Sequence, residues 1–205
     1  MLKVALTGGI ATGKSHVVGL LREHGIACLD ADALAHGVTA AGTEATLAIA
    51  ARFGSDVIAA DGSVDRQKLG SIVFADDSAR RDLEAIVHPA VYRAIGAGLR
   101  AFELMGEPLV VVDVPLLYET GHEGEYDRVV LTAAPVEAQI DRLTRRGLAS
   151  EDARRRIAAQ MSGEAKAARA DYVIRTDGSF DDTARQVDRV ITALQSEKAE
   201  GKRQK

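Results

Sequence analysis

The sequence predicts an α/β fold in which a five-stranded parallel sheet is flanked by helices and carries helical insertions. Five short apolar runs are typical of strands buried on both faces: 4–7, 26–29, 109–113, 128–132 and 172–175. Segments with helical spacing separate these runs, which is the order expected of βαβ units. A glycine-rich turn directly follows the first run, and strand, turn and helix in this order favour an anion-binding site.

This glycine-rich turn is the most specific motif of the chain. Residues Gly8 to Ser15 read G-G-I-A-T-G-K-S and match the phosphate-loop pattern G-x-x-x-x-G-K-[ST] at every fixed position. In such a loop successive backbone N–H groups point at a phosphate, and the following helix adds its positive end. We expect Lys14 to contact the β- and γ-phosphates and the Ser15 hydroxyl to ligate Mg²⁺. The motif therefore predicts a P-loop NTPase core.

The other elements follow along the chain. A helix is predicted over 15–24, where apolar residues recur at helical spacing before Gly25 ends it. The stretch from 33 to 106 is predicted to be mostly helical, with turns at 53–54 and 61–62. A second helical insertion is expected over 136–169 and a last helix over 181–196, and the polar residues after it are expected to fray.

Composition excludes several classes of protein. A net charge of −4 argues against a nucleic-acid binder that depends on a general positive field. The single cysteine, Cys28, cannot form an internal disulfide and is predicted to be a buried structural thiol. No apolar run approaches 20 residues and no signal-peptide pattern opens the chain, so we expect a soluble, cytoplasmic protein without a membrane partner.

Acidic residues follow two of the predicted strands. In open α/β sheets, ligands bind beyond the carboxyl ends of the strands, where Asp30, Asp32 and Asp113 fall. A carboxylate at Asp32 could take a proton from an attacking hydroxyl, orient that hydroxyl or hold Mg²⁺ through water. A helix cap is the alternative for both Asp30 and Asp32, and for Asp30 it is equally well supported. The apolar run that ends in Asp113 has the form of a Walker B segment, which predicts a place in the Mg²⁺ shell.

Basic residues cluster in the second insertion, at Arg142, Arg145, Arg146 and 154–156. They form either a solvated helical face or a lid whose guanidinium groups close over a polyphosphate. Arg142 shares one helical face with Arg145 or Arg146, at spacings of three and four residues. We predict the lid role for at least one of them.

With these residues laid out, the chain resembles dephospho-coenzyme A kinases along nearly its whole length. Besides the phosphate loop, the matching segments include L-D-A-D at 29–32, L-E-A-I-V-H-P at 83–89, V-D-V-P-L-L-Y-E at 112–119, R-R-G-L at 145–148 and R-I-A-A-Q at 156–160. The resemblance implies a phosphotransferase with an alcohol acceptor. It would use ATP and Mg²⁺ to phosphorylate the ribose 3′-hydroxyl of dephospho-CoA, the last step of coenzyme A biosynthesis.

The resemblance also implies the roles of individual residues. ATP would be bound by Gly8, Gly9, Ile10, Ala11, Thr12, Gly13, Lys14, Ser15 and His16. Catalysis would rest on Asp32 as base, with Lys14, Arg142 and Arg145 stabilising the transferred charge. The acceptor would contact Thr7, Asp32, Arg66, His88, Pro115 and Leu116, and the metal would contact Ser15 and Asp113.

The implied organisation is a nucleotide-binding core, two insertions and a tail. The core comprises 1–32, 107–135 and 170–196; 33–106 would bind the acceptor, 136–169 would be the lid, and 197–205 a polar tail. The expected partners are ATP and dephospho-CoA alone, in a monomer or weak homo-oligomer. Two other functions stay open: a P-loop kinase for another small hydroxylated acceptor, and a nucleotide-binding switch or partner-dependent ATPase.

The chain departs from the family pattern at several positions. Ala11 stands where the family usually has Gly, and its methyl group is expected to be harmless if the φ angle there is negative. His16 replaces Thr or Ser, and Arg175-Thr176 replaces an acid-Asn pair near the adenine site. Arg145 and Arg146 both fit the lid arginine, and counting back from Gln160 favours Arg145.

Overall fold

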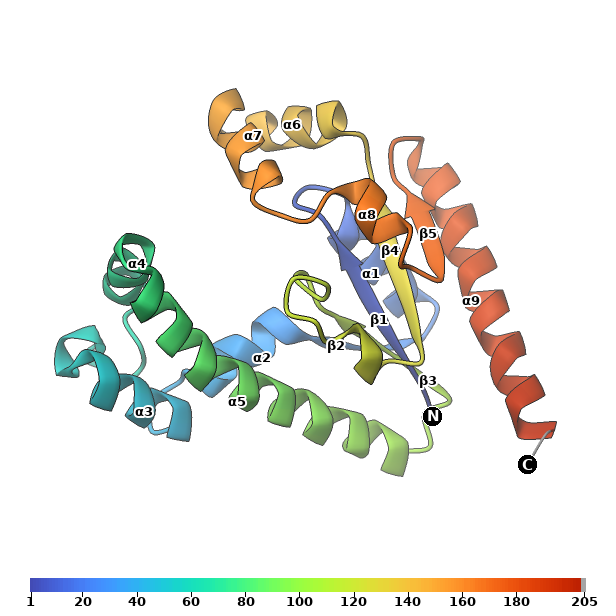
Figure 1. Ribbon diagram of the computed structural model, residues 1–205. Coiled ribbons are helices and arrows are strands. Elements are labelled where there is room, and N and C mark those ends of the chain that lie inside the picture. Colours follow the sequence, from blue (N-terminus) through green and yellow to red (C-terminus); the bar gives the residue numbers. More distant parts are fainter. Residues whose placement is uncertain (204–205) are drawn as a thin grey trace. The chain divides into compact units, whose positions relative to one another are not determined.

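The computed structural model describes residues 1–203 and divides the chain into two compact units (Figure 1). One unit comprises Met1–Leu29 and the chain from Phe102 onward, and the other comprises Asp30–Ala101. The second unit occupies most of the region in which the acceptor site was expected, whereas the expected lid belongs to the unit that contains the sheet.

The sheet has five strands in the order β2-β3-β1-β4-β5. They are β1 (Leu2–Gly8), β2 (Ala27–Asp30), β3 (Leu109–Asp113), β4 (Arg128–Ala133) and β5 (Tyr172–Arg175). The central strand β1 runs parallel to both neighbours, with Leu6 opposite Asp113 and Gly8 opposite Thr132. The predicted parallel α/β fold is thus confirmed, and β1 delivers the glycine-rich turn to the middle of the sheet edge.

Two helices cover one face of this sheet. They are α1 (Lys14–Glu23) and α9 (Phe180–Arg203), whose buried Val17, Leu21, Val187 and Ile191 pack on strand residues such as Val4 and Leu6. Each fully buried aliphatic side chain of this kind stabilises the fold by about 1.5–3 kcal/mol. Helix α1 ends as predicted, because Gly25 has a φ of 72° and the next N–H, of Ile26, bonds to the Leu21 carbonyl at 3.0 Å.

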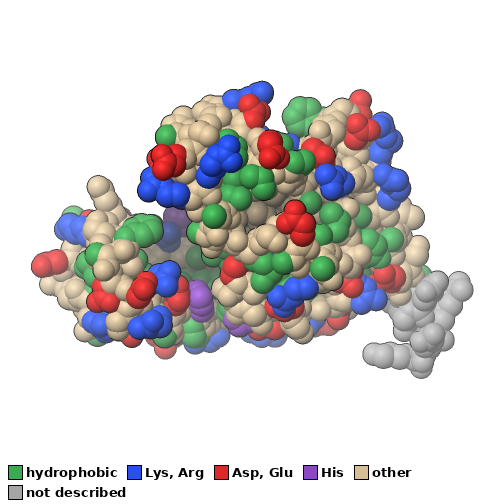
Figure 2. All heavy atoms as spheres, turned by 45° about the horizontal axis from the view of Figure 1, so that its top comes forward, with side chains coloured by type: hydrophobic (Ala, Val, Ile, Leu, Met, Phe, Trp, Pro, Cys, Tyr) green, Lys and Arg blue, Asp and Glu red, His purple; other side chains and the backbone are tan. Residues whose placement is uncertain are grey.

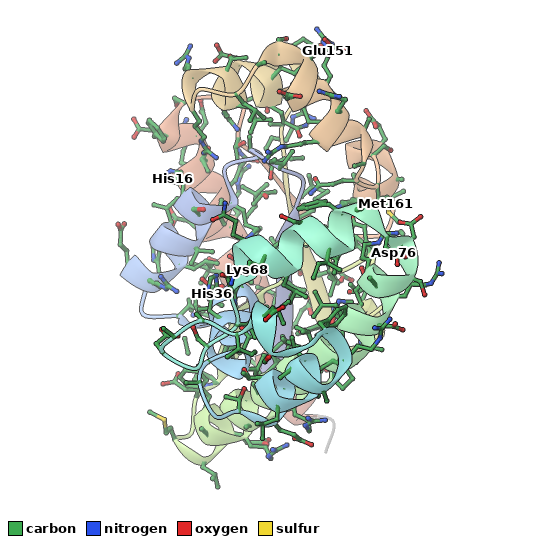
Figure 3. All side chains as sticks on the ribbon, turned by 90° about the vertical axis from the view of Figure 1, so that its left-hand side faces the viewer. His16, His36, Lys68, Asp76, Glu151 and Met161 are labelled. Carbon is green, nitrogen blue, oxygen red and sulfur yellow. The ribbon has the colours of Figure 1, made fainter. Side chains whose placement is uncertain are left out.

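The second insertion forms α6 (Val136–Arg145), α7 (Ser150–Ala158) and α8 (Gly163–Ala167). Ile140, Leu143 and Ala153 make a small apolar cluster, against which Ile10 and Ala11 of the glycine-rich turn pack. Figure 1 shows α6 and α7 above the turn that follows β1, and Figure 3 marks the outer end of this pair with Glu151. The insertion therefore lies over the anion-binding edge of the sheet.

The unit Asp30–Ala101 is helical. It contains α2 (Ala31–Val38), α3 (Glu44–Phe53), the 3₁₀ turn Ser55–Val57, α4 (Arg66–Ala75) and most of α5 (Asp77–Leu104). Its core is formed by Ile49, Val57, Val64 and Leu69. The Asp30 side chain accepts a hydrogen bond from the Ala33 N–H at 3.0 Å, so it caps α2. For Asp30, the alternative of a helix cap is the one the structure bears out.

The last helix is longer than the sequence pattern predicts. Helix α9 runs to Arg203, so the prediction that it ends near 196 is wrong, and positions 204 and 205 lie outside the described residues. Glu197 explains part of the extension, because it accepts a hydrogen bond from the Tyr172 hydroxyl and lies 2.8 Å from Arg128 Nε. The hydrogen bond to Glu197 also raises the pKa of Tyr172 above its ordinary value.

Charged side chains of both signs intermingle over the face seen in Figure 2. In the part of the chain that the structure describes, no helix combines the length and the apolar character needed to cross a bilayer. Cys28 is free and half-buried rather than fully buried, and burial raises the pKa of its thiol.

Candidate active site

The glycine-rich turn closes because two of its positions tolerate only glycine. A Cβ on Gly8 would lie 2.1 Å from Thr132 Oγ1, and Gly13 has a φ of 82°. The Thr12 hydroxyl donates to the Gly9 carbonyl at 2.8 Å and fixes the loop from inside. The backbone N–H groups at the start of α1 then face outward, as a phosphate site requires.

Ala11 occupies a strained position in this loop. Its φ is +58°, so the condition under which its methyl group would be harmless is not met. An alanine in the left-handed region costs about 1–2 kcal/mol. Two contacts hold it there: its methyl group belongs to the apolar cluster of Ile140 and Leu143, and its carbonyl accepts from Arg142 Nη1 at 3.0 Å. The strain is therefore offset by contacts with the helical insertion.

Lys14 and Asp113 form an ion pair beside the loop. The Lys14 ammonium donates to Asp113 Oδ1, and both side chains are largely buried, with 16% and 13% of their surface exposed. Ser15 follows on the first turn of α1 with an exposed side chain. A hydroxyl and a carboxylate are the hard oxygen ligands that Mg²⁺ prefers. Among the described residues no cluster of three or more His, Cys, Asp or Glu side chains could hold a metal, so Mg²⁺ would need further oxygens from a nucleotide.

A cavity of about 640 Å³ opens over the loop. Its lining comprises Gly8–His16, Pro115, Arg142, Arg146, Gln160, Thr176, Gly178, Ser179, Phe180 and Thr183. A volume between 300 and about 1,000 Å³ is typical of a small-molecule site. All nine residues that the sequence assigned to ATP therefore line a single cavity.

Arg142 is fixed on the wall of this cavity. Its guanidinium donates to the Ala11 carbonyl at 3.0 Å, to Thr176 Oγ1 at 3.1 Å and to the Thr176 carbonyl. Thr176 in turn donates its hydroxyl to the Thr12 carbonyl at 2.7 Å. The arginine thus clamps the phosphate loop to the segment after β5.

The two remaining lid arginines differ in position. Arg146 lines the cavity, whereas Arg145 is absent from the lining. Arg145 is 78% exposed, and its Nη2 lies 3.0 Å from Asp141 Oδ2 one turn away on the same helix. For Arg145 this is the solvated-face arrangement that the sequence left open, and of the two alternatives only Arg146 lines this cavity.

An aromatic pair forms the far wall of the cavity. The His16 and Phe180 ring centroids lie 4.9 Å apart with an edge-to-face geometry, and 76% of Phe180 is exposed. His16 Nε2 is shielded from solvent and has no hydrogen-bond partner within the described residues. Beside them, a hydrogen bond from the Ser179 hydroxyl lowers the pKa of Asp182. This wall offers a nucleotide base the exposed apolar ring of Phe180.

The predicted acceptor residues divide between the two units. Thr7 is fully buried and donates its hydroxyl to the Pro115 carbonyl at 3.2 Å, so its side chain is already engaged. Pro115 lines the cavity, and Leu116 follows it, 44% exposed.

The other three predicted acceptor residues lie in the unit Asp30–Ala101. Asp32 is exposed on the first turn of α2, and His88 lies within α5. Arg66 donates to Thr39 Oγ1 at 2.8 Å and to the Ala35 carbonyl at 3.2 Å. These bonds hold Arg66 at one end of its helix without neutralising its charge.

Sequence reasoning missed the cavity residues that come from the segments after α7 and β5: Gln160, Gly178, Ser179, Phe180 and Thr183. Gln160 was visible only as the last residue of the R-I-A-A-Q segment, and Phe180 as an apolar residue before the last helix. Neither carries a local pattern that distinguishes a cavity residue from a surface residue.

Known proteins similar to this chain include several dephospho-CoA kinases. A family model described as dephospho-CoA kinase matches residues 2–182. A dephospho-CoA kinase from Symbiobacterium thermophilum is 50% identical over 186 residues, which is 90% of this chain and 78% of that protein. The crystal structure of TT1252 from Thermus thermophilus has a TM-score of 0.80 and 36% identity, covering 94% of this chain and 97% of that one. Dephospho-CoA kinase from Campylobacter jejuni has a TM-score of 0.74 and 26% identity, covering 95% and 97%.

Proposed function

The chain belongs to the dephospho-CoA kinase family, and we propose that it moves the γ-phosphoryl group of Mg-ATP to the ribose 3′-hydroxyl of dephospho-CoA. The P–O bond to the ADP leaving oxygen breaks, a P–O bond to the acceptor oxygen forms, and the hydroxyl proton passes to a base. The observation that carries the proposal is the cavity over the phosphate loop, in a chain that matches the family over residues 2–182.

The phosphate loop positions the donor. Backbone N–H groups from Gly13 to Ser15 and the positive end of α1 attract the β- and γ-phosphates. Lys14 adds a mobile positive charge that can shift from Asp113 toward the phosphates. Since phosphoryl transfer depends mainly on alignment and charge stabilisation, this loop supplies much of the catalysis.

Ser15 and Asp113 are the residues that would hold Mg²⁺. When bound, the ion would neutralise negative charge on the β- and γ-phosphate oxygens. Asp113 ends β3 directly beside the loop strand, opposite Leu6, so its carboxylate is presented at the edge where the nucleotide binds.

The lid arginines stabilise the transferring charge. Arg142 holds the loop in shape through Ala11 and Thr176, and its fixed guanidinium presents a positive charge to the cavity. Arg146 lines the same cavity and is the better candidate for direct contact with the polyphosphate.

Asp32 is proposed as the base that accepts or orients the acceptor hydroxyl. It follows β2 by two residues, in the position that the family resemblance gives to the catalytic carboxylate. Arg66, His88, Pro115 and Leu116 are proposed to bind dephospho-CoA. Arg66 is suited to an anionic acceptor, because its hydrogen bonds to neutral groups leave its charge uncompensated.

The decisive assay measures ADP release from Mg-ATP with and without dephospho-CoA, and identifies the product by mass. ADP release that depends on dephospho-CoA, with one phosphate gained by the acceptor, supports the function. ATP binding without this dependence would redirect the assignment to another hydroxylated acceptor, and a panel of nucleosides and nucleoside monophosphates would follow.

Two aspartates two residues apart provide a matched test of the base. Asp32→Asn should lower kcat by about 10²- to 10⁴-fold with little change in ATP affinity, because it removes the proton acceptor alone. Asp30→Asn should leave kcat unchanged, because asparagine caps a helix as well as aspartate does. Equal rates for the two variants would remove Asp32 from the role of base.

We also propose a cytoplasmic enzyme that works as a monomer or a weak homo-oligomer. One free cysteine suits a reducing compartment. Light scattering across a protein concentration series would measure the oligomeric state.

A further inference from the structure

Gln160 lies where the helical insertion returns to the sheet. It follows α7 and precedes α8, and its neighbour Met161 is labelled in Figure 3. Its side chain lines the large cavity over the phosphate loop and also a smaller one of about 260 Å³ behind Gly9. It is therefore the residue of the return segment closest to the nucleotide site.

The orientation of the Gln160 amide is fixed by its partner. Gln160 Oε1 accepts the Ile10 backbone N–H at 2.8 Å. A backbone N–H can only donate, so the amide oxygen must face the loop and the NH₂ group must point elsewhere. Among the described residues this NH₂ group donates no hydrogen bond, and Gln160 borders the cavity.

The backbone around Gln160 is held as firmly as its side chain. The Met161 N–H donates to Glu119 Oε1 at 3.1 Å, and the Lys166 ammonium lies 2.7 Å from the same oxygen. Lys166 is fully buried, and Arg169 closes the segment through an ion pair with Glu123. Glu119 thus anchors the return segment to the turn after β3, and the hydrogen bond from Met161 restrains the backbone next to Gln160.

We propose that Gln160 donates its side-chain N–H to the β,γ end of the ATP polyphosphate while its oxygen stays on Ile10. This inference rests on the proposed function and adds a substrate-binding residue to it. The amide joins three parts of the molecule: the phosphate loop, the return segment and the bound nucleotide. The neutral amide would bind the phosphates through a hydrogen bond, whereas Lys14 and Arg146 would attract them through their positive charges.

Two substitutions separate this role from a structural one. Gln160→Glu retains an oxygen acceptor for the Ile10 N–H but replaces the donor with a second oxygen, which repels a phosphate. Gln160→Met has a similar length and lacks both functions. If the only role of Gln160 is to accept from Ile10, Gln160→Met is impaired more than Gln160→Glu, which keeps that acceptor.

The experiment measures dissociation constants for ATP and for AMP by calorimetry on both variants, with the melting temperature as a check on folding. We expect Gln160→Glu to raise the Kd for ATP about 10- to 100-fold, the loss expected for a hydrogen bond to a charged group, and to change the Kd for AMP less than about twofold. Gln195→Glu, which adds the same charge on the exposed side of α9, should leave both constants unchanged.

Three results would overturn the proposal. They are an unchanged Kd for ATP in Gln160→Glu, an equal loss for ATP and AMP, and impairment confined to Gln160→Met. The proposed function fails separately, if the wild-type chain binds ATP but shows no ADP release that depends on dephospho-CoA.

Discussion

The phosphate loop and the segment that returns from α7 to α8 border the same cavity, but the chain specifies them in different ways. The loop is eight consecutive residues whose glycines permit one tight turn between a strand and the helix that follows it. The return segment is positioned by contacts between distant parts of the chain: Gln160 and Ile10 are 150 residues apart, and Met161 and Glu119 are 42 apart. The site therefore has a local half, which consecutive residues form, and an assembled half, which contacts between distant segments form.

The largest effect should come from the local half. Lys14→Ala removes the charge proposed to contact the phosphates, and we expect kcat/KM to fall by about 10²- to 10³-fold or more. Lys3→Ala, on the strand that leads into the loop, should stay within about twofold. Steady-state kinetics with both substrates tests this, and an unchanged ATP affinity in Lys14→Ala would count against the loop assignment.

In the assembled half, we expect substitutions to lower the stability of the fold. Glu119→Gln leaves the fully buried Lys166 without its ion-pair partner, which should cost about 3 kcal/mol of unfolding free energy. For a chain of this size that corresponds to a fall of about 6–12 °C in Tm. The double variant Glu119→Gln/Lys166→Met should recover most of the loss, because it removes the buried charge. A double variant no more stable than the single one would show that the ion pair is not what anchors the segment.

Substitutions of Arg145 and Arg146 compare how much each side chain contributes to activity. Arg146→Ala should lower kcat/KM about tenfold, because a cation on the cavity wall is removed. Arg145→Ala should stay within about twofold, because exposed ion pairs such as Arg145–Asp141 contribute little. The reverse order of effects would restore Arg145 as the lid arginine.

The smallest effect is expected on stability at Ala11, the loop residue that packs against the helical insertion. Ala11→Gly relieves a left-handed alanine and should stabilise the chain by about 1 kcal/mol, or about 2–4 °C in Tm. Ala85→Gly, at an exposed position inside α5, should destabilise it by a similar amount. If Ala11→Gly lowers Tm instead, the methyl contact with Ile140 and Leu143 outweighs the strain.

Much of the fold was predictable because the strands and the phosphate loop correspond to short patterns of neighbouring residues in the sequence. The apolar runs gave all five strands to within two residues at each end, and Gly25 marked the end of α1. The end of α9 was not predictable, because Glu197 is tied to Arg128 and Tyr172 on neighbouring strands. The positive φ at Ala11 was not predictable for a related reason: packing on α6 compensates a conformation that alanine alone avoids.

The sequence by itself determined the phosphate loop, the order of strands and helices, and the family resemblance, because each depends on neighbouring residues or on a repeating spacing. Only the tertiary structure decided that Arg146 rather than Arg145 lines the cavity, and that Gln160 and Phe180 join it. One residue along a helix turns a side chain by about 100°, so a cluster of arginines does not show which one faces inward. Side chains that enter a site from distant segments leave no spacing in the sequence, and only their contacts identify them.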